Sequence, residues 1–362
     1  MRICLVGGIF GKAAEYRATI QRTPETVLES GLRDRGHSVT TVSHFAPVRF
    51  STFDVVHVHH LSFGAIAAAA AEPKSPLVFT SHAFRQLSWI RRAAMSYVLS
   101  NAEAAVVLSE SEAAWQRRLF PRGTADQYVI PNGIDEKVFA HQAPVLPAAG
   151  KPWRLLYVGQ LADIKGVEYL VRALPLVAPE LRVELDLVYH VRTAEERLRG
   201  EVRQLGLRNV HFLGARQPAE VAALYADAHV LVLPSTAEAF PTVIAEALLV
   251  GRPIVATDVG AVRGQVGSFG EVVQARQPQA LADGINRVLQ TYERLSGRSE
   301  VVSAQAAECY SVTAMLDAHE AMYEACMNAP ATSATIARRL GRGSLRRFIA
   351  TAQLLRRPRS PS

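Results

Sequence analysis

Two glutamates, Glu238 and Glu246, stand eight residues apart in the segment 235–247, which reads Ser-Thr-Ala-Glu-Ala-Phe-Pro-Thr-Val-Ile-Ala-Glu-Ala. The apolar and β-branched run before it, His229–Leu233, predicts a buried strand. The run Thr242–Val250 is followed by a glycine and predicts a short helix. We therefore expect Glu238 in the loop at the carboxyl end of the strand and Glu246 one turn into the helix.

The start of this helix is suited to bind an anion. The backbone N–H groups of Thr242, Val243 and Ile244 have no partner within a helix, and they lie at its positive end, where phosphate oxygens bind. A carboxylate on each side can accept hydrogen bonds from hydroxyls. A nucleotide sugar carries hydroxyls on both sides of a diphosphate, so these residues predict a nucleotide-sugar site. The alternative is a solvated loop glutamate followed by a glutamate on a helix surface.

The same segment resembles the Glu-x7-Glu signature of the retaining glycosyltransferases of family 4, which have the GT-B fold of two Rossmann-like domains. The resemblance implies that Glu238 contacts hydroxyls of the transferred sugar. It implies that Glu246 holds the ribose of the nucleotide. We also assign Phe240, Thr242 and Val243 to the donor-binding site.

A second segment, Leu155–Gly166, resembles the family's diphosphate-binding turn and reads Leu-Leu-Tyr-Val-Gly-Gln-Leu-Ala-Asp-Ile-Lys-Gly. The family usually has Gly-Arg-Leu here, and its Arg and Lys clamp the donor diphosphate. Gly159 and Lys165 match this pattern, but Gln160 replaces the arginine and carries no charge. Part of the clamp is then missing or supplied elsewhere. Lys165 as an ordinary lysine at a helix start is the alternative, although a cation is unfavourable at that positive end.

Two further segments match the family in the right order. Asn209–Ser235 resembles its base-binding stretch, which implies that the base lies against the backbone near Gly214 and Ala215. Val129–Asp135, Val-Ile-Pro-Asn-Gly-Ile-Asp, resembles the end of its N-terminal domain, although Pro-Asn-Gly by itself already predicts a turn. The resemblance covers residues 1–327.

A chain of 362 residues is too long for one compact core and predicts two domains plus a tail. Residues 140–151 have the composition of a linker. We expect an N-terminal acceptor domain at 1–140, a linker at 141–151, a donor domain at 152–305, a helix at 306–327 and a basic tail at 328–362. The resemblance implies that the helix packs back on the first domain.

Both halves alternate short apolar runs with helical segments, which predicts an α/β fold of doubly wound parallel sheets. The strands expected in the first half are Arg2–Val6, Ser38–Val42, Val55–Val58, Leu77–Thr80, Ala104–Leu108 and Gln127–Ile130, with helices near Pro24–Gly36, Phe63–Ala71, Arg85–Ser100 and Glu110–Leu119. Those expected in the second half are Arg154–Val158, Val183–Val188, Val210–Leu213, His229–Leu233 and Pro253–Ala256, with later helices near Gln279–Leu295 and Val301–Cys326.

Candidate residues of the first domain follow its strands. The long segment Gly7–Thr23 comes after the first strand, at the sheet edge where α/β proteins bind ligands. We expect Gly7 and Gly8 to let the backbone approach the acceptor; a simple tight turn is the alternative. His82 follows another strand at the same edge, and the resemblance implies a place near the transferred sugar, so we assign it to the reaction. A capping or hydrogen-bonded loop histidine is the alternative.

His57, His59 and His60 form a cluster, and the first two share one face of a strand, as metal ligands could. No carboxylate or cysteine lies at ligand spacing beside them, and similar histidines occur in the family without metal. The chain also lacks the Asp-x-Asp pattern by which other glycosyltransferases hold a divalent cation. We therefore expect no metal and no cofactor besides the donor substrate.

The positive charge of the chain is concentrated at its end. Residues 325–362 contain eight of the 40 basic residues and none of the 33 acidic ones, so residues 1–324 carry a net charge of −1 against +7 for the whole chain. This distribution argues against nucleic acid as a partner of the body. Within 334–359, one helical stripe bordered by arginines holds four apolar residues, Leu345, Phe348, Ala352 and Leu355. It predicts a helix on an anionic membrane; a disordered basic tail is the alternative.

Apolar runs and cysteines in the sequence indicate the cellular compartment of the protein. No apolar run approaches the roughly 20 residues of a membrane-spanning helix, and the N-terminal run resembles a first strand more than a signal peptide. Three widely spaced cysteines are typical of reduced thiols. We expect a cytoplasmic protein that the tail brings to the inner face of the membrane.

These motifs together predict a retaining, metal-independent glycosyltransferase that moves a sugar from a UDP- or GDP-linked donor to a hydroxyl acceptor, such as a lipid-linked or cell-envelope glycan. Catalysis would rest on Lys165, Glu238 and His82. The resemblance implies a front-face displacement, the mechanism usually proposed for the family, and the lack of a convincing protein nucleophile fits it. Two alternatives remain: a non-catalytic nucleotide-sugar-binding subunit of a glycan-assembly complex, and a two-Rossmann nucleotide-sugar epimerase.

Overall fold

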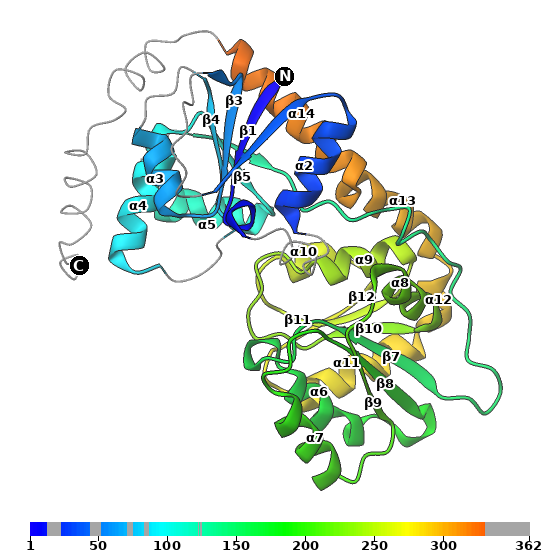
Figure 1. Cartoon of the computed structure of the whole chain (residues 1–362). Coiled ribbons are helices and arrows are strands. Elements are labelled where there is room, and N and C mark those ends of the chain that lie inside the picture. Colours follow the sequence, from blue (N-terminus) through cyan, green and yellow to red (C-terminus); the bar gives the residue numbers. More distant parts are fainter. Residues whose placement is uncertain are drawn as a thin grey trace. The chain divides into compact units, whose positions relative to one another are not determined.

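The computed structural model describes residues 1–12, 23–43, 52–70, 75–82, 87–121, 123 and 125–329. They form two compact units (Figure 1). The first unit holds Met1–Gly133 together with the described chain from Val312 onward, and the second holds Ile134–Ser311. Each unit is built on a parallel sheet of six strands. The predicted fold class of two doubly wound parallel sheets is therefore confirmed.

The sheet of the first unit has the strand order β2-β1-β3-β4-β5-β6. Its strands are β1 (Arg2–Val6), β2 (Ser38–Val42), β3 (Val55–His59), β4 (Leu77–Thr80), β5 (Ala104–Val107) and β6 (Asp126–Val129), and its helices are α2 (Pro24–Asp34), α3 (Phe63–Ala70), α4 (Trp89–Asn101), α5 (Glu110–Leu119), α14 (Val312–Asn328) and the 3-10 turn η1 (Ile9–Gly11). The chain moves outward from β1 to β2 and returns to β3 on the other side of β1. The point of reversal lies between β1 and β3, where such sheets bind ligands.

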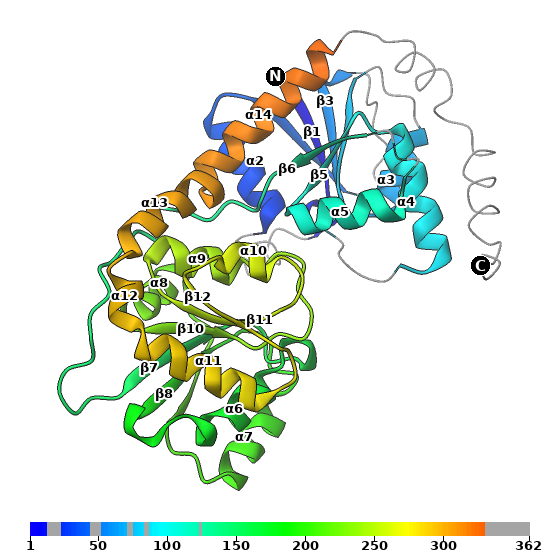
Figure 2. The ribbon, with the colours of Figure 1, turned by 180° about the vertical axis from the view of Figure 1, so that it is seen from behind.

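Helices cover both faces of this sheet, as Figure 2 also shows. Apolar side chains of α2 and α14 pack on one face, and those of α3 and α4 pack on the other. Strands β1, β3, β4 and β5 are buried on both faces because both are covered, whereas the edge strands β2 and β6 are partly exposed. Thr23 caps α2 and Pro24 takes the first helical position, so this helix starts where the Thr-Pro pair predicted.

The sheet of the second unit has the order β12-β11-β10-β7-β8-β9. Its strands are β7 (Trp153–Val158), β8 (Val183–Val188), β9 (Val210–Gly214), β10 (Val230–Leu233), β11 (Ile254–Thr257) and β12 (Gly270–Val273), and its helices are α6 (Val167–Ala173), α7 (Glu195–Gln204), α8 (Pro218–Asp227), α9 (Thr242–Val250), α10 (Val262–Val266), α11 (Pro278–Gln290), α12 (Tyr292–Ser296) and α13 (Ser299–Tyr310), with 3-10 turns η3 (Asp163–Lys165), η4 (Leu174–Leu176) and η5 (Pro179–Leu181). Helices α8, α9 and α10 lie on one face, and α6, α7 and α11 on the other (Figures 1 and 2). The point of reversal lies between β7 and β10.

The division between the units differs from the predicted domain limits. The second unit begins at Ile134, before the predicted linker, because the Ile134 N–H donates to the Tyr310 carbonyl at 2.8 Å and Phe139 packs edge-on against Tyr225. The single helix expected near 301–326 is two helices, α13 and α14, separated at Ser311. Ser311 has an extended backbone with ψ of 156° and pairs with Ile134. The predicted helix at 306–327 is therefore shared between the units.

The C-terminal tail from residue 330 lies outside the described residues, so the membrane contact predicted for 334–359 stays a prediction. Among the helices that the structure does describe, none combines the length and the apolar character needed to cross a bilayer.

Candidate functional site

A pocket of about 330 Å³ lies in the second unit at the carboxyl ends of β7 and β10, where the strand order reverses. Its volume falls in the range of small-molecule sites. Seven residues predicted to bind the donor line it: Gly159, Gln160, Lys165, Glu238, Phe240, Thr242 and Val243. Gly214 and Glu246 are absent from the lining, although Ala215, next to Gly214, belongs to it. The segments 155–166 and 235–247 meet at this pocket because β7 and β10 are neighbouring strands in the sheet.

Lys165 and Glu238 form an ion pair in the wall of this pocket. The Lys165 Nζ donates to Glu238 Oε1 at 2.6 Å, and the Ser235 hydroxyl donates to the same oxygen at 2.6 Å. The Glu238 side chain is 9% exposed. Its loop passes close to Gly260, where a Cβ would lie 2.0 Å from the Glu238 carbonyl oxygen. The pocket wall therefore contains one cationic group, the Lys165 ammonium, and one anionic group, the Glu238 carboxylate.

The turn that carries Lys165 is attached to the β10 loop. The backbone N–H and the hydroxyl of Thr236 donate to the Ile164 carbonyl at 2.8 and 3.0 Å. Gly166 has φ of 61°, and a Cβ there would lie 2.3 Å from the Pro234 carbonyl oxygen. A left-handed φ and this close approach both require glycine. The glycine after Lys165 is thus needed to join the two loops.

The start of α9 supplies backbone donors to the pocket. Thr242 and Val243 line it, and no side chain caps the helix at Pro241. The Ile244 N–H donates to the Pro241 carbonyl at 3.2 Å, so the expectation that it is free is wrong. The helix closes its first turn on that carbonyl and leaves the first two N–H groups for an anion.

Gly159 and Gln160 lie in the turn directly after β7. The Tyr157 hydroxyl donates to the Gln160 carbonyl at 2.7 Å, and a Cβ at residue 159 would lie 2.6 Å from the same hydroxyl oxygen. Gly159 is therefore required by packing against Tyr157. The Gln160 side chain is exposed at the pocket wall and brings no charge.

Arg216 and His190 also line this pocket, and reasoning from sequence missed both. Arg216 is exposed, and its guanidinium donates to the Ala215 carbonyl at 2.9 Å. Each residue follows the carboxyl end of a strand, β8 for His190 and β9 for Arg216. That position was the signal that could have found them. Arg216 is a second cation at the site, where Gln160 supplies none.

Glu246 lies within α9, behind the pocket wall. The Tyr225 hydroxyl lies 3.0 Å from Glu246 Oε2 and 3.1 Å from the Val243 carbonyl oxygen. Although the residue keeps some exposed surface, burial raises the pKa of Glu246 to about 7, an effect that the hydrogen bond from Tyr225 only partly offsets. Its carboxyl group therefore titrates at a higher pH than that of an exposed glutamate.

Comparison with known proteins agrees with this geometry. A family model described as Glycosyl transferases group 1 matches residues 152–291, and one described as Glycosyltransferase Family 4 matches residues 47–138. The chain belongs to the family 4, group 1 glycosyltransferases. The first match includes the residues that line the pocket of the second unit, and the second covers β3 to β6 of the first unit.

Relatives of this glycosyltransferase family include a D-inositol 3-phosphate glycosyltransferase of Xylanimonas cellulosilytica, 28% identical over 74% of this chain and 72% of its own. A phosphatidyl-myo-inositol mannosyltransferase of Mycobacterium tuberculosis is 29% identical over 66% and 65%. With a D-inositol 3-phosphate glycosyltransferase of Corynebacterium urealyticum, the match spans only 55% of the relative's length.

Solved structures of glycosyltransferases share the fold. A sucrose-phosphate synthase of Thermosynechococcus elongatus has a TM-score of 0.74 at 21% identity, covering 90% of this chain and 98% of its own. The Anabaena protein HepE, solved with UDP, has a TM-score of 0.70 at 19% identity, covering 90% and 100%. These likenesses confirm the predicted GT-B fold.

The predicted acceptor-side glycines of this glycosyltransferase lie directly after β1. The Gly7 N–H donates to the Val42 carbonyl at 3.0 Å, and a Cβ there would lie 3.1 Å from the Phe10 ring. Gly8 has φ of −63°, which any residue adopts. Residues 13–22 of the same loop lie outside the described residues. The acceptor role of Gly7 and Gly8 stays a prediction.

His57 is a structural residue of the first unit. Its Nδ1 lies 2.7 Å from the Tyr323 hydroxyl and its Nε2 lies 2.7 Å from the Thr80 hydroxyl. Both ring nitrogens are thus satisfied, and burial lowers its pKa well below the usual value. His57 is fully buried, and its hydrogen bonds explain its position in the histidine cluster without a bound ligand.

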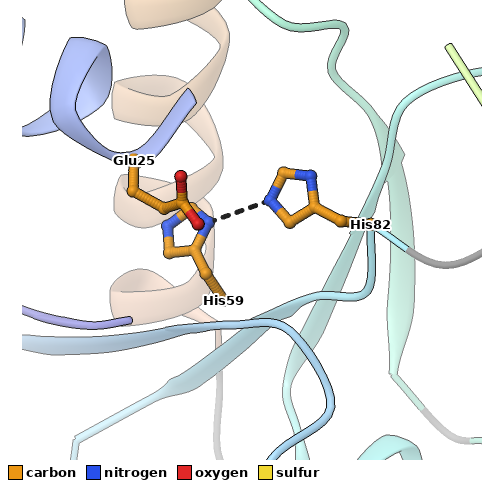
Figure 3. A group of neighbouring side chains, drawn as sticks. All are labelled: Glu25, His59 and His82. Carbon is orange, nitrogen blue, oxygen red and sulfur yellow. Dashed lines mark hydrogen bonds between the residues drawn. The ribbon is translucent and has the colours of Figure 1, made fainter. Parts of the chain in front are cut away.

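His59 and His82 meet at the carboxyl edge of the same sheet, as Figure 3 shows, with His59 Nδ1 and His82 Nε2 3.2 Å apart. Burial lowers the pKa of His82 to about 4, and the neighbouring His60 adds to the effect. Glu25 lies beside them, with its carboxylate 2.7 Å from His60 Nε2. The sequence showed no carboxylate near the histidines because Glu25 belongs to a different element, α2. The assignment of His82 to the reaction stays a prediction.

Proposed function

We propose that this chain is a retaining glycosyltransferase that transfers a sugar from a nucleoside diphosphate sugar to a hydroxyl acceptor. The observation that carries the proposal is the Lys165–Glu238 pair, at 2.6 Å, beside the uncapped start of α9. A cation and free N–H groups attract a diphosphate, and a carboxylate accepts hydrogen bonds from sugar hydroxyls.

Catalysis follows from the charge that develops on the leaving diphosphate. The Lys165 ammonium and the N–H groups of Thr242 and Val243 stabilise this charge as the bond to the sugar breaks. Glu238 is the single carboxylate among the lining residues, and we assign it to sugar hydroxyls rather than to nucleophilic attack. The leaving phosphate then takes the proton of the acceptor hydroxyl on the same face. We expect no metal at the diphosphate because Lys165 supplies the positive charge.

The names of the related proteins support the substrate classes. HepE was solved with UDP and with UDP-glucose, which favours a uridine-linked donor over a guanosine-linked one. Two relatives are named as transferases acting on inositol compounds, one of them a phospholipid, which is compatible with a hydroxyl on a lipid-linked or cell-envelope acceptor. A tail lying on an anionic membrane would bring the enzyme to such an acceptor.

Calorimetric titration with UDP-glucose, GDP-mannose and ADP-glucose tests the donor. We expect one of them to bind at one site per chain and to raise the unfolding temperature, since a ligand that binds only the native state adds about 2.7 kcal/mol at 100 times its Kd. NMR of the product formed with an inositol acceptor then reports whether the anomeric configuration is retained. Failure of all nucleotide sugars to bind would refute the proposal, and an inverted product would refute the retaining mechanism.

One observation favours a second candidate, a non-catalytic nucleotide-sugar-binding subunit. Gln160 stands where the family usually has an arginine, so the leaving group has one less cation from this turn. Arg216 lines the same pocket from β9 and can offset that loss. Donor binding without release of nucleoside diphosphate, in the presence of inositol and lipid acceptors, would favour the second candidate.

A further inference from the structure

Tyr225, near the end of α8, connects that helix to α9, the helix that begins at the pocket of the second unit. Its hydroxyl oxygen lies 3.0 Å from Glu246 Oε2 and 3.1 Å from the Val243 carbonyl oxygen. Val243 lines the pocket, and Glu246 is the residue that we assign to the donor ribose. Tyr225 is not among the residues that line the pocket, so any effect it has on a bound donor passes through these two neighbours.

The hydroxyl of Tyr225 has one proton and two possible acceptors. A tyrosine hydroxyl donates a single hydrogen bond, so Glu246 and Val243 compete for it. A hydrogen bond to an ionised group is roughly twice as strong as one between neutral groups. The proton therefore points to Glu246 Oε2 when the carboxyl group is ionised, which is the form expected to bind the ribose.

The ring of Tyr225 is fixed by packing. The residue has no exposed surface, and its ring centroid lies 5.9 Å from that of Phe139, with the two ring planes at 77°. This is the edge-to-face arrangement that aromatic pairs prefer. A ring enclosed in this way cannot turn away from α9, so the hydroxyl stays beside Glu246.

The backbone of Tyr225 is held by a buried arginine. Arg252 is 1% exposed and directly follows Gly251, which ends α9. Its guanidinium donates to the carbonyl oxygens of Tyr225 at 2.8 Å, Ala226 at 2.9 Å and Gln142 at 2.9 Å. The first two belong to the last turn of α8, where carbonyls lack helical partners and a cation is favourable. Arg252 thus joins the ends of α8 and α9, and the Tyr225 side chain joins the two helices a second time.

The hydrogen bond from Tyr225 also acts on the ionisation of Glu246. Burial raises the pKa of Glu246, and this hydrogen bond lowers it in part. Helices α8, α10 and α13 pack against α9. Their other titratable side chains are Glu220 and Asp227 of α8, Arg263 of α10, and Glu300, Glu308, Cys309 and Tyr310 of α13. Within the part of the chain that the structure describes, Tyr225 is the one titratable group that shifts the pKa of Glu246.

We propose that Tyr225 is a positioning residue of the donor site, which holds Glu246 Oε2 so that Oε1 accepts a hydrogen bond from the donor. Arg252 supports this role by fixing the backbone of Tyr225. The inference rests on the proposed function, because it needs a donor in this pocket. In the competing interpretation Tyr225 only joins α8 to α9, and its hydroxyl then contributes to stability and not to donor affinity through Glu246.

Calorimetric titration of Tyr225→Phe tests the proposal, with the nucleotide sugar that binds the wild type most tightly among UDP-glucose, GDP-mannose and ADP-glucose. The variant keeps the ring and removes the hydroxyl. At pH 7 we expect the Kd to rise by about 3–10-fold, as for the loss of one hydrogen bond. At pH 9 the rise should be smaller, because Glu246 is then ionised in both proteins. A purely structural loss would weaken binding equally at both pH values.

Two further variants locate the effect. Tyr292→Phe is the matched control, because Tyr292 is 2% exposed and its hydroxyl has no hydrogen-bond partner among the described residues, so this variant should bind as the wild type does. In a Glu246→Gln background, Tyr225→Phe should weaken binding little further, since two changes that act through one contact are not additive. Circular dichroism of each variant checks the fold.

The pKa of Glu246 gives a readout that needs no donor. The carboxyl carbon of Glu246 is followed by NMR in protein labelled with ¹³C-glutamate, and its signal is identified by its absence from Glu246→Gln. We expect a pKa of about 7 in the wild type and a higher value in Tyr225→Phe, because a hydrogen bond to the ionised form favours that form.

Two results would overturn the proposal: a folded Tyr225→Phe variant with wild-type donor affinity at both pH values, or an equal loss at both that persists in the Glu246→Gln background. A wild type that binds none of the three nucleotide sugars refutes the proposed function, and with it the role in donor binding, even where Tyr225→Phe raises the pKa of Glu246. If Tyr225→Phe does not fold, 3-fluorotyrosine at position 225, a stronger hydrogen-bond donor, should lower the pKa of Glu246 and tighten donor binding at pH 7. No change in either quantity counts against the proposal.

Discussion

Replacing Glu246 by glutamine tests whether this residue holds the donor ribose. The variant keeps the size of the side chain and a carbonyl oxygen that the Tyr225 hydroxyl, now 3.0 Å from Oε2, can still approach. It removes the charge that strengthens hydrogen bonds from ribose hydroxyls. A hydrogen bond to a charged group contributes about 1.5–3 kcal/mol, so at pH 8 we expect the Kd for UDP-glucose to rise by about 10–150-fold.

The pKa of Glu246 gives this prediction a second readout. Burial raises it to about 7 in the free protein, so about a tenth of the carboxyl groups are ionised at pH 6 and about nine-tenths at pH 8. If the ionised form binds the ribose, donor affinity should increase with pH across this window, by at most about tenfold, or about 1.4 kcal/mol. UDP-glucose is the suitable ligand because its diphosphate keeps a constant charge between pH 6 and 8.

The assay is calorimetric titration of wild type, Glu246→Gln and a control, Glu293→Gln, at pH 6, 7 and 8. Glu293 is exposed on α12 and does not line the pocket, so its variant should bind as the wild type does. The glutamine variant should bind weakly and show no dependence on pH. Equal affinity of wild type and Glu246→Gln at pH 8, together with a flat wild-type profile, would refute the ribose assignment.

Four further predictions follow from the same structure. Lys165→Ala should lower turnover more than donor affinity, because leaving-group charge is larger in the transition state; weaker binding with unchanged turnover at saturation would make Lys165 a binding residue only. Gln160→Arg should be tolerated and should tighten donor binding, and a large loss of affinity would reveal a specific contact of the glutamine. Gly260 has φ of 56°, and a Cβ there would lie 2.0 Å from the Glu238 carbonyl oxygen, so Gly260→Ala should cost more than about 1 kcal/mol of stability and reduce donor affinity. Gly206 has φ of 66° but open space around it, so Gly206→Ala should reduce stability alone. Full-length protein should co-sediment with anionic vesicles more than a chain ending at Asn328 does, and equal binding of both would exclude the tail.

The residues that line the pocket of the second unit were largely predictable because they lie close to strand ends. A parallel sheet places every carboxyl end at one edge, so Lys165 and Glu238 needed only neighbouring strands to meet. Their 2.6 Å pair is the outcome. The prediction failed at Ile244, whose N–H bonds to the Pro241 carbonyl. It also missed Arg216, although this residue follows the carboxyl end of β9, where such sheets bind ligands.

The boundary between the two units could not be predicted from local sequence signals. No glycine or proline marks the break at Ser311, which follows from pairing with Ile134, a residue far away in the sequence. The last strand, β12, is four residues long and begins with glycine, so its local signal is weak, and pairing with β11 decides its conformation.

The sequence by itself determined the alternation of strands and helices and the motifs that follow β7 and β10, because these depend on local periodicity and on residues within one loop. Only the tertiary structure decided that Glu25 lies beside His59 and His82, since the three come from different elements and no spacing rule connects them. The same holds for Glu246, whose raised pKa depends on what encloses it. Residues of one loop are neighbours in the sequence, so their chemistry can be predicted from it. Burial and contacts between distant residues arise only when the strands pair into sheets and the helices cover them.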